Sequence, residues 1–168
     1  HTPIRRQRQM CIRDSVNKTT DAIIGSAFGS AGERCMAISV AVCVGKKTAE
    51  NLKTKLIEET SKLNVGPYTD EKSDFGPLNN KAHYEKVLGY IDTGEKEGAK
   101  LLSDGRNMKL QGYENGYFVG PTIFEDVKPD MKIYKEEIFG PVLSMMTTDT
   151  YEDALKLVND HELGNGAA

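Results

Sequence analysis

Cys35 is the residue of this sequence whose surroundings best suit covalent chemistry. It stands in the stretch FGSAGERCMA (residues 28–37), three residues after Gly32 and directly after Arg34. Glycines permit unusual backbone angles and let a ligand approach the main chain closely. If the chain enters a helix or tight turn at Cys35, backbone N–H groups can stabilise a thiolate or an oxyanion. The stretch predicts a nucleophilic thiol; the alternative is a small buried hydrophobic residue, the commoner role of a free cysteine.

The other residues that could do chemistry carry less information on their own. Cys43 lies in the apolar run VAVCV (residues 40–44), so we expect it in the core. Glu136, Glu137 and Phe139 stand together in the stretch EEIFGPV. Taken alone, they would be two solvated loop charges and a core aromatic.

The cysteines and histidines form no recognisable metal or triad pattern. Cys11, Cys35 and Cys43 contain no CxxC pair and no zinc spacing with a histidine, so we expect reduced thiols and no metal site. His83 faces away from the apolar side of its predicted helix, and His161 ends the last predicted helix. We expect neither histidine to lie near a motif, so a Ser-His-Asp or Cys-His arrangement lacks support.

Four motifs in order resemble those of one enzyme family. The stretch around Cys35 resembles the active-site cysteine motif of the aldehyde dehydrogenase superfamily, and EEIFGPV, about a hundred residues downstream, resembles its second signature. Between them stand the family-like stretches DFGPL (residues 74–78) and GYFVGPTI (residues 116–123). The resemblance covers nearly everything after Asn17. GSAFGSAGERCMA, GYENGYFVGPTIF and the terminal GNGAA are most similar to the methylmalonate-semialdehyde dehydrogenase branch, which is CoA-acylating.

This resemblance implies roles for individual residues. Cys35 would be the nucleophile, whose thiolate attacks the aldehyde to give a thiohemiacetal, with its own N–H as one oxyanion donor. Glu137 would bind the nicotinamide ribose by accepting from two vicinal hydroxyls, and Phe139 would pack beside the nicotinamide ring. Arg34 would hold the substrate carboxylate, which a guanidinium fork fits. Glu33, which varies with glutamine in the motif, is expected to be structural.

The function implied by the resemblance is NAD-dependent oxidation of a semialdehyde through a cysteine thioester that is released to coenzyme A. Methylmalonate and malonate semialdehydes would be the substrates, with propionyl-CoA or acetyl-CoA, CO2 and NADH as products. Two alternatives stay open: an aldehyde dehydrogenase of other specificity with hydrolytic release, and an inactive truncated binding or assembly module. The full-length protein would be a homo-oligomer (homotetramer), cytoplasmic in a bacterium and in the mitochondrial matrix of a eukaryote.

Composition excludes several other classes. The 168 residues include 22 Lys+Arg and 25 Asp+Glu, a formal charge of −3, so the chain is no strongly basic nucleic-acid binder. With 38% hydrophobic residues, it has too many aliphatics for a disordered chain. The longest near-apolar run, residues 36–45, is about half of the roughly 20 residues that a membrane helix needs. We expect neither a nucleic-acid partner nor a membrane span.

The first fifteen residues differ from the rest. Residues 1–15 contain four arginines against one aspartate, a charge of +3, whereas residues 16–168 carry 18 positive and 24 negative groups, a charge of −6. The segment has no apolar periodicity. A transit peptide and a nucleic-acid arm are alternatives, but we interpret it as translated adapter sequence in which Cys11 has no function.

The remaining sequence alternates between helix and strand patterns, which is typical of a layered α/β domain. Apolar residues at i, i+3, i+4 and i+7 predict helices with apolar faces at Ile24–Ala31 and Tyr84–Ile91, and Leu52, Leu56, Ile57 and Leu63 mark another helix between them. Strands are predicted over residues 37–44, 99–102, 117–124 and 141–147.

A last helix is predicted from Thr150, with Asp153 three residues on as a capping-box-like signal. Its apolar face would consist of Ala154, Leu155 and Val158.

The sequence holds no counterpart of the family's upstream nucleotide-binding region, its oxyanion-hole asparagine or its general-base glutamate. We therefore expect residues 16–168 to form part of an aldehyde dehydrogenase catalytic domain, incomplete at both ends. By itself this part is expected to be inactive.

Overall fold

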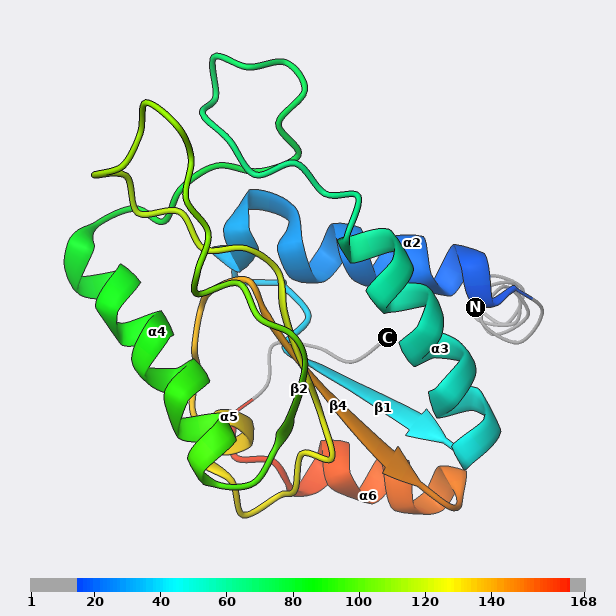
Figure 1. Ribbon diagram of the computed structural model, residues 1–168. Helices are drawn as coiled ribbons and strands as arrows, with labels where there is room; N and C mark the ends of the chain where they lie inside the picture. The colour runs from blue at the N-terminus through cyan, green and yellow to red at the C-terminus, as the bar shows by residue number, and fades with distance from the viewer. Residues whose placement is uncertain (1–14, 164–168) are drawn as a thin grey trace.

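The computed structural model describes residues 15–163 of the chain. The segment that we interpret as adapter sequence, apart from Ser15, and the terminal GNGAA lie outside the described residues. From Ser15 the chain runs through alternating helices and strands (Figure 1). The elements are α2 (Val16–Phe28), the 3-10 helix η1 (Gly29–Gly32), β1 (Val40–Val44), α3 (Lys46–Thr60), α4 (Lys81–Lys96), β2 (Lys100–Ser103), β3 (Thr122–Glu125), α5 (Lys132–Lys135), β4 (Val142–Thr148) and α6 (Tyr151–Asp160).

The strands form one mixed sheet in the order β1-β4-β3-β2. β4 pairs in parallel with both β1 and β3, with Ala41 opposite Met145 and Ile123 opposite Leu143. β2 joins β3 antiparallel at the edge. Parallel strands that are joined through helices are characteristic of α/β proteins, so the predicted fold class is confirmed.

Helices cover both faces of this sheet. Phe124 and Glu125 are neighbours in β3 and therefore point to opposite faces. On one side, a Cβ added to Gly94 of α4 would lie 2.8 Å from the Phe124 ring. On the other side, the Glu125 carboxylate accepts a hydrogen bond from Lys53 of α3 at 2.8 Å. In Figure 1, α4 and α5 accordingly lie to the left of the strands and α3 to the right.

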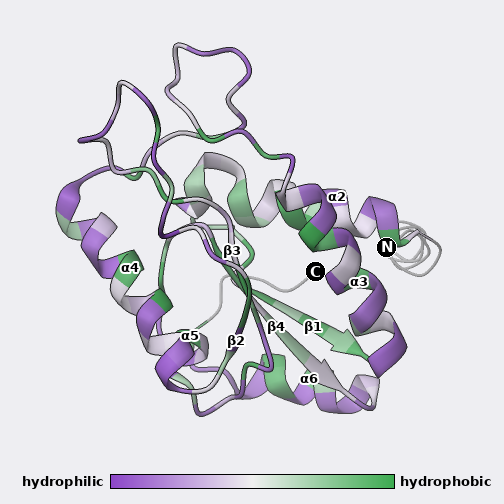
Figure 2. Cartoon of the chain, in the orientation of Figure 1, coloured by the Kyte–Doolittle hydropathy of each residue, from purple (hydrophilic) through white to green (hydrophobic). Residues whose placement is uncertain are grey.

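The hydrophobic core lies along the two central strands. Ile123 and Phe124 of β3 and Leu143 of β4 are fully buried, as are Leu56 of α3 and Ile91 of α4. Figure 2 shows hydrophobic residues along β1 and the inner helix faces, with hydrophilic residues outside. Burial of this apolar surface is the main force that holds the three layers together.

Most predicted helices are confirmed, with differences at their ends. Thr150 caps α6 as expected, since its hydroxyl accepts the Asp153 N–H at 3.1 Å. α3 ends at Thr60, so Leu63 lies beyond the helix and packs against the core from the following turn.

The apolar face predicted for α6 is wrong in part. Ala154 is buried, but Leu155 and Val158 are 47% and 43% exposed. The amphipathic pattern predicts the helix correctly, yet within residues 15–163 only one edge of its apolar stripe meets the sheet.

Two predicted strands begin later than expected. β1 starts at Val40 rather than residue 37, because residues 37–39 form the exit from a turn at Cys35. β3 starts at Thr122 rather than residue 117, because Gly120 first donates its N–H to the Gly105 carbonyl at 3.0 Å. A local turn in the first place, and a contact with a distant loop in the second, replaces the extended conformation that the residue types favour.

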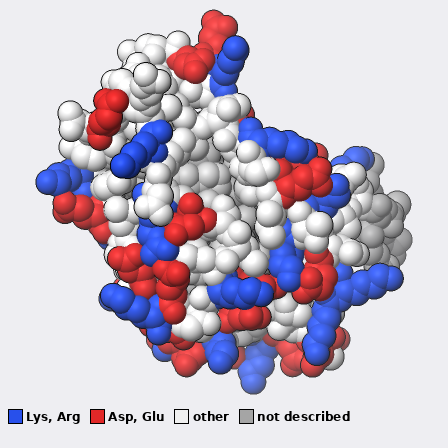
Figure 3. Space-filling view, viewed as in Figure 1, with Lys and Arg blue, Asp and Glu red and all other residues white. Residues whose placement is uncertain are grey.

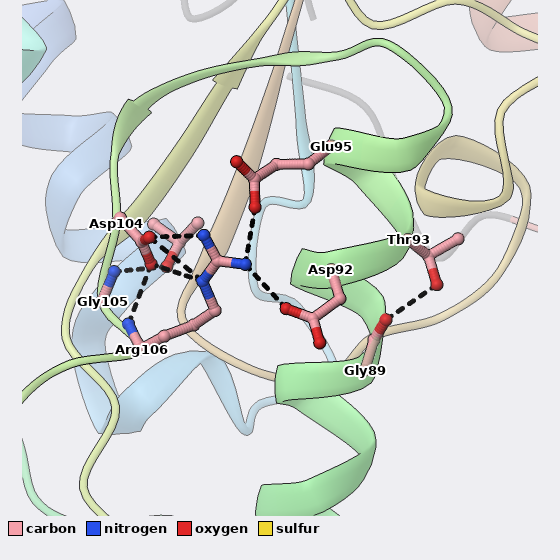
Figure 4. Close-up of polar contacts among 8 residues, drawn as sticks. Gly89, Asp92, Thr93, Glu95, Asp104, Gly105 and Arg106 are labelled. Carbon is pink, nitrogen blue, oxygen red and sulfur yellow. Dashed lines mark hydrogen bonds and ion pairs between the residues drawn. The ribbon is translucent and has the colours of Figure 1, made fainter.

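An ion-pair cluster attaches the loop after β2 to α4. Arg106 Nη1 lies 2.6 Å from Asp92 and 2.6 Å from Glu95, both on α4, and Arg106 Nε donates to Asp104 Oδ1 at 2.9 Å. Figure 4 shows the guanidinium lying between these three carboxylates. The Arg106 guanidinium lowers the pKa of the Asp104 carboxyl. The cluster fixes α4, which carries several side chains of the candidate site.

Charges of both signs are interspersed over the face drawn in Figure 3. In the described residues, no helix has both the length and the apolar character that crossing a bilayer requires.

Candidate active site

Cys35 lies in an exposed turn that follows a strained segment. The Ala37 N–H donates to the Arg34 carbonyl at 3.0 Å, which closes a turn with Cys35 inside it, and the Cys35 side chain is exposed. Immediately before it, Ser30 and Ala31 have left-handed φ angles of 54° and 55°. We call residues 30–37 the Cys35 turn. The tight turn that the sequence allowed for is therefore present, and the alternative of a buried cysteine is wrong for this residue.

The second motif forms a loop, residues 136–141, which we call the EEIFGP loop. Its Phe139 also has a left-handed φ, of 60°, and its ring is 36% exposed. Non-glycine residues in this region are strained and persist only where their surroundings hold them, often at functional sites. Glu137 is exposed, so both residues that the resemblance assigned to cofactor binding face solvent.

The Cys35 turn and the EEIFGP loop pack directly against each other. A Cβ added to Gly32 would lie 2.2 Å from the carbonyl oxygen of Gly140. Gly32 also has a φ of 71°, which favours glycine. Two motifs about a hundred residues apart are thus in backbone contact.

One face of α4 holds the EEIFGP loop. Lys86 Nζ donates to the Glu137 carbonyl at 3.1 Å, and the Tyr90 hydroxyl donates to the Glu136 carboxylate at 2.5 Å. The hydrogen bond to Glu136 is the main cause that raises the pKa of Tyr90 to about 12. These contacts fix the backbone of the loop while leaving the Glu137 carboxylate exposed.

The expectation that His83 lies near no motif is wrong. Its Nε2 lies 2.6 Å from the Phe139 carbonyl oxygen and 3.3 Å from the Glu33 carboxylate, so it contacts both motifs. His83 is far from both motifs in sequence, and α4 brings it to them only in the fold. The sequence feature that could have indicated this contact is the spacing of His83, Lys86 and Tyr90, which places three polar side chains on one face of the helix. His161 instead contacts the Tyr134 carbonyl.

Arg34 points back toward α2. Its Nη2 donates to the carbonyl oxygens of Gly25 at 2.5 Å and Ser26 at 3.1 Å. Gly29 leaves room for this arrangement, since a Cβ there would lie 2.8 Å from Nη2. Arg34 thus directly precedes Cys35 in the chain, and carbonyl groups of α2 anchor its guanidinium.

Cys43 behaves as a core residue, as predicted. It is 4% exposed in β1, and burial raises the pKa of its thiol to about 11. Within residues 15–163, no group of three or more histidine, cysteine, aspartate or glutamate side chains is placed to bind a metal ion.

Comparison with known proteins identifies relatives of this chain. The malonate-semialdehyde dehydrogenase of Pseudomonas aeruginosa is 50% identical over 151 residues, which are 90% of this chain and 30% of that protein. The mitochondrial, acylating methylmalonate-semialdehyde/malonate-semialdehyde dehydrogenase of Bos taurus is 51% identical over 150 residues, 89% of this chain and 28% of that protein. The chain therefore spans less than a third of the length of these relatives.

Solved structures show the same fold. A Sinorhizobium meliloti protein, assigned as a methylmalonate-semialdehyde dehydrogenase and complexed with NAD, matches with a TM-score of 0.89 and 54% identity over 90% of this chain and 31% of that chain. A Thermus 1-pyrroline-5-carboxylate dehydrogenase with bound NAD matches with a TM-score of 0.81 and 32% identity over 89% of this chain and 28% of that chain. The aldehyde dehydrogenase family matches residues 10–168, a range that starts within the segment expected to stand apart. The chain belongs to the aldehyde dehydrogenase family.

Proposed function

We propose that the protein to which this chain belongs is an NAD-dependent, CoA-acylating semialdehyde dehydrogenase, and that Cys35 is its nucleophile. The observation that carries the proposal is the contact of the exposed Cys35 turn with the EEIFGP loop, through Gly32 and Gly140. A nucleophile and the loop assigned to the cofactor must be neighbours for one substrate to meet both. Relatives named as methylmalonate- and malonate-semialdehyde dehydrogenases support this substrate class.

The EEIFGP loop fits the nicotinamide half of NAD. The Glu137 carboxylate is exposed and makes no hydrogen bond or ion pair with any residue from 15 to 163, so it can accept from two vicinal ribose hydroxyls. The partly exposed Phe139 ring offers a surface on which a nicotinamide ring can pack. When bound here, NAD supplies the hydride acceptor of the oxidation.

Cys35 carries the covalent chemistry. Its thiolate forms the carbon–sulfur bond to the aldehyde carbon, and the carbonyl electron pair moves onto oxygen. After oxidation the acyl group stays on the Cys35 sulfur as a thioester. In the proposed reaction the substrate carboxyl group leaves as CO2, and the thiol of coenzyme A attacks the thioester, loses its proton to solvent, takes the acyl group and returns the Cys35 thiolate.

Arg34 is the proposed partner of the substrate carboxylate. Arg34 directly precedes Cys35 in the chain, so in this proposal the carboxylate of a short-chain semialdehyde binds the guanidinium while its aldehyde meets the sulfur. The anchoring of Nη2 on the Gly25 and Ser26 carbonyls restricts the guanidinium, which lowers the entropy lost on binding. The location would be the cytoplasm for a bacterial source and the mitochondrial matrix for a eukaryotic one.

A chimera tests the function in a full-length protein. Residues 16–168 replace the matching part of the Pseudomonas aeruginosa relative, and NADH formation is followed with methylmalonate and malonate semialdehydes. Cys35→Ser is expected to abolish NADH formation, whereas Cys43→Ser, the matched control in β1, keeps it. An active Cys35→Ser chimera would refute the assignment of the nucleophile.

Omitting coenzyme A tests the acyl acceptor. If release is to coenzyme A, NADH formation without it stops after about one equivalent per site, because the thioester accumulates. Continuous NADH formation without coenzyme A would instead establish hydrolytic release.

A further inference from the structure

His83 connects the two segments that the proposed function assigns to the nucleophile and the cofactor. Its Nε2 lies 2.6 Å from the Phe139 carbonyl oxygen and 3.3 Å from Glu33 Oε1. Glu33 stands two residues before Cys35. His83 is thus in polar contact with both the Cys35 turn and the EEIFGP loop.

The chemistry of the two partners fixes where a proton must be. A backbone carbonyl oxygen and a carboxylate oxygen are both acceptors, so both contacts of His83 attract only if Nε2 carries a hydrogen. The ring is then either the Nε2–H tautomer or the imidazolium, and in both forms it donates one N–H toward the two acceptors. Removing the ring leaves Glu33 with the Asn79 N–H at 3.4 Å and leaves the Phe139 carbonyl without this donor.

The setting makes this connection stronger than a surface contact. The side chains of His83 and Glu33 are each 15% exposed, so water screens them only partly. The His83 ring also meets the edge of the Phe139 ring, with centroids 6.2 Å apart at 65°. Aromatic rings in this edge-to-face geometry attract each other.

Both connected segments contain strained backbone. Phe139 has a φ of 60°, and Ser30 and Ala31 have φ angles of 54° and 55°. Such conformations relax unless several contacts oppose the relaxation. His83 supplies a contact to each segment from a third, regular element, α4.

The neighbours of His83 on α4 show what its removal would and would not change. Lys86 and Tyr90 bond to Glu137 and Glu136, so the EEIFGP loop would stay attached to α4 without His83. The hydrogen bonds of these two side chains to the loop do not pass through the Cys35 turn. Loss of His83 would therefore loosen the turn relative to the loop rather than release the loop itself.

We propose that His83 is a positioning residue that holds the Cys35 turn in register with the EEIFGP loop for hydride transfer. The proposal rests on the proposed function, which assigns the aldehyde to Cys35 and the nicotinamide to Phe139. Transfer requires the reacting atoms to be near contact and aligned, so a small shift between the two segments slows it strongly. His83 acts through Glu33 and the Phe139 backbone and touches neither reactant.

The test uses the full-length chimera with its cofactor and four variants. His83→Ala removes the donor, and His83→Leu removes it while keeping most of the ring's volume, in case the alanine variant does not fold. His83→Gln restores an amide that can donate to both acceptors. His161→Ala is the matched control, since it also removes a histidine–carbonyl contact, to Tyr134, outside the site.

We expect His83→Ala and His83→Leu each to lower kcat about tenfold. A tenfold change corresponds to the loss of one hydrogen bond to a charged or strained partner. The KM for the aldehyde should change less than about twofold. The primary isotope effect with substrate deuterated at the aldehyde carbon should increase, because hydride transfer becomes slower. His83→Gln should recover most of kcat, and His161→Ala should alter neither quantity.

A second measurement checks that His83 acts through Glu33. If the two residues form one connection, Glu33→Ala and His83→Ala lower kcat by similar factors. The double variant is then about tenfold slower than the unmutated chimera, and not about a hundredfold slower as two independent effects would make it. Unchanged kcat and isotope effect in an active His83→Ala chimera would overturn this inference alone. An unmutated chimera that forms no NADH would overturn the proposed function, and this inference with it.

Discussion

Gly32 and Gly140 lie so close together that a single Cβ on Gly32 would come within 2.2 Å of the Gly140 carbonyl oxygen. One glycine stands three residues before Cys35 and the other directly follows Phe139. The absence of a side chain at Gly32 therefore permits the backbone contact between the Cys35 turn and the EEIFGP loop.

Gly32→Ala is expected to destabilise the protein by roughly 2–4 kcal/mol, because backbone opposes the new Cβ and the φ of 71° disfavours it. Gly25→Ala is the matched control in α2. A Cβ there meets no atom within 4 Å, and alanine in a helix is favoured over glycine by about 0.5–1 kcal/mol. Urea unfolding of both variants measures the difference. Equal stability of the two variants would contradict the close approach.

The two described cysteines should react with iodoacetamide at very different rates. Cys35 is exposed, whereas Cys43 is buried with its thiol pKa raised to about 11, so little Cys43 thiolate exists near neutral pH. In a Cys11→Ser background, mass spectrometry at pH 8 should locate the label on Cys35. Labelling of Cys43 should begin only as the pH approaches 11 or after unfolding. Comparable labelling of both at pH 8 would argue against a poised nucleophile.

Gly29→Ala should weaken binding of the substrate carboxylate. The new Cβ would lie 2.8 Å from Arg34 Nη2, and the end of this flexible side chain can move away at little cost in stability. The guanidinium then loses its anchor on the Gly25 and Ser26 carbonyls. We expect the KM for the semialdehyde to rise about three- to tenfold, in keeping with one weakened charge-assisted contact.

Gly89→Ala, on an open face of α4, is the control for Gly29→Ala and should leave KM unchanged. An aldehyde of similar length without a carboxylate gives a second comparison. Its KM should be the same with glycine or alanine at position 29. An equal rise for both aldehydes would show that Arg34 does not bind the carboxylate.

The sequence predicts the elements better than the contacts between them. Helices at Tyr84–Ile91 and at Thr150 follow from periodicity and capping, which are local. The start of β1 is wrong because residues 37–39 leave the Cys35 turn, and the later start of β3 reflects the Gly120–Gly105 contact. A local turn in the first case and a tertiary contact in the second override the preference of β-branched residues for strands.

The candidate site shows the same limit. The sequence identifies Cys35, Glu137 and Phe139 as candidate site residues because each stands in a motif. Their exposed positions in the structure suit the proposed roles. His83 stands outside the motifs quoted, and its partners Glu33 and Phe139 lie about fifty residues away on either side. A single sequence holds no record of which loops meet at the end of a helix, so this residue became visible only in the fold.

Arg106→Met should lower the free energy of unfolding in a pH-dependent way. Arg106 lies between Asp92, Glu95 and Asp104, and it lowers the pKa of Asp104 (Figure 4). Because the folded pKa is below the unfolded one, this stabilisation is complete above the unfolded pKa of about 4 and is lost as the pH falls through the folded value. We expect a loss of about 1 kcal/mol at pH 7, since the groups are partly exposed.

The same substitution at acidic pH supplies the sharper comparison. Between pH 7 and pH 3 the pH falls toward the lowered pKa of the Asp104 carboxyl, so the difference in stability between Arg106→Met and the unmutated protein should decrease. Lys62→Met removes exposed ion pairs that join the turn after α3 to Glu58 and Glu59 in the last turn of that helix, and it should have no measurable effect at either pH. Urea unfolding at pH 7 and pH 3 measures all three proteins. A difference for Arg106→Met that is the same at both pH values would show that packing of the arginine stem, rather than its charge, attaches the loop to α4.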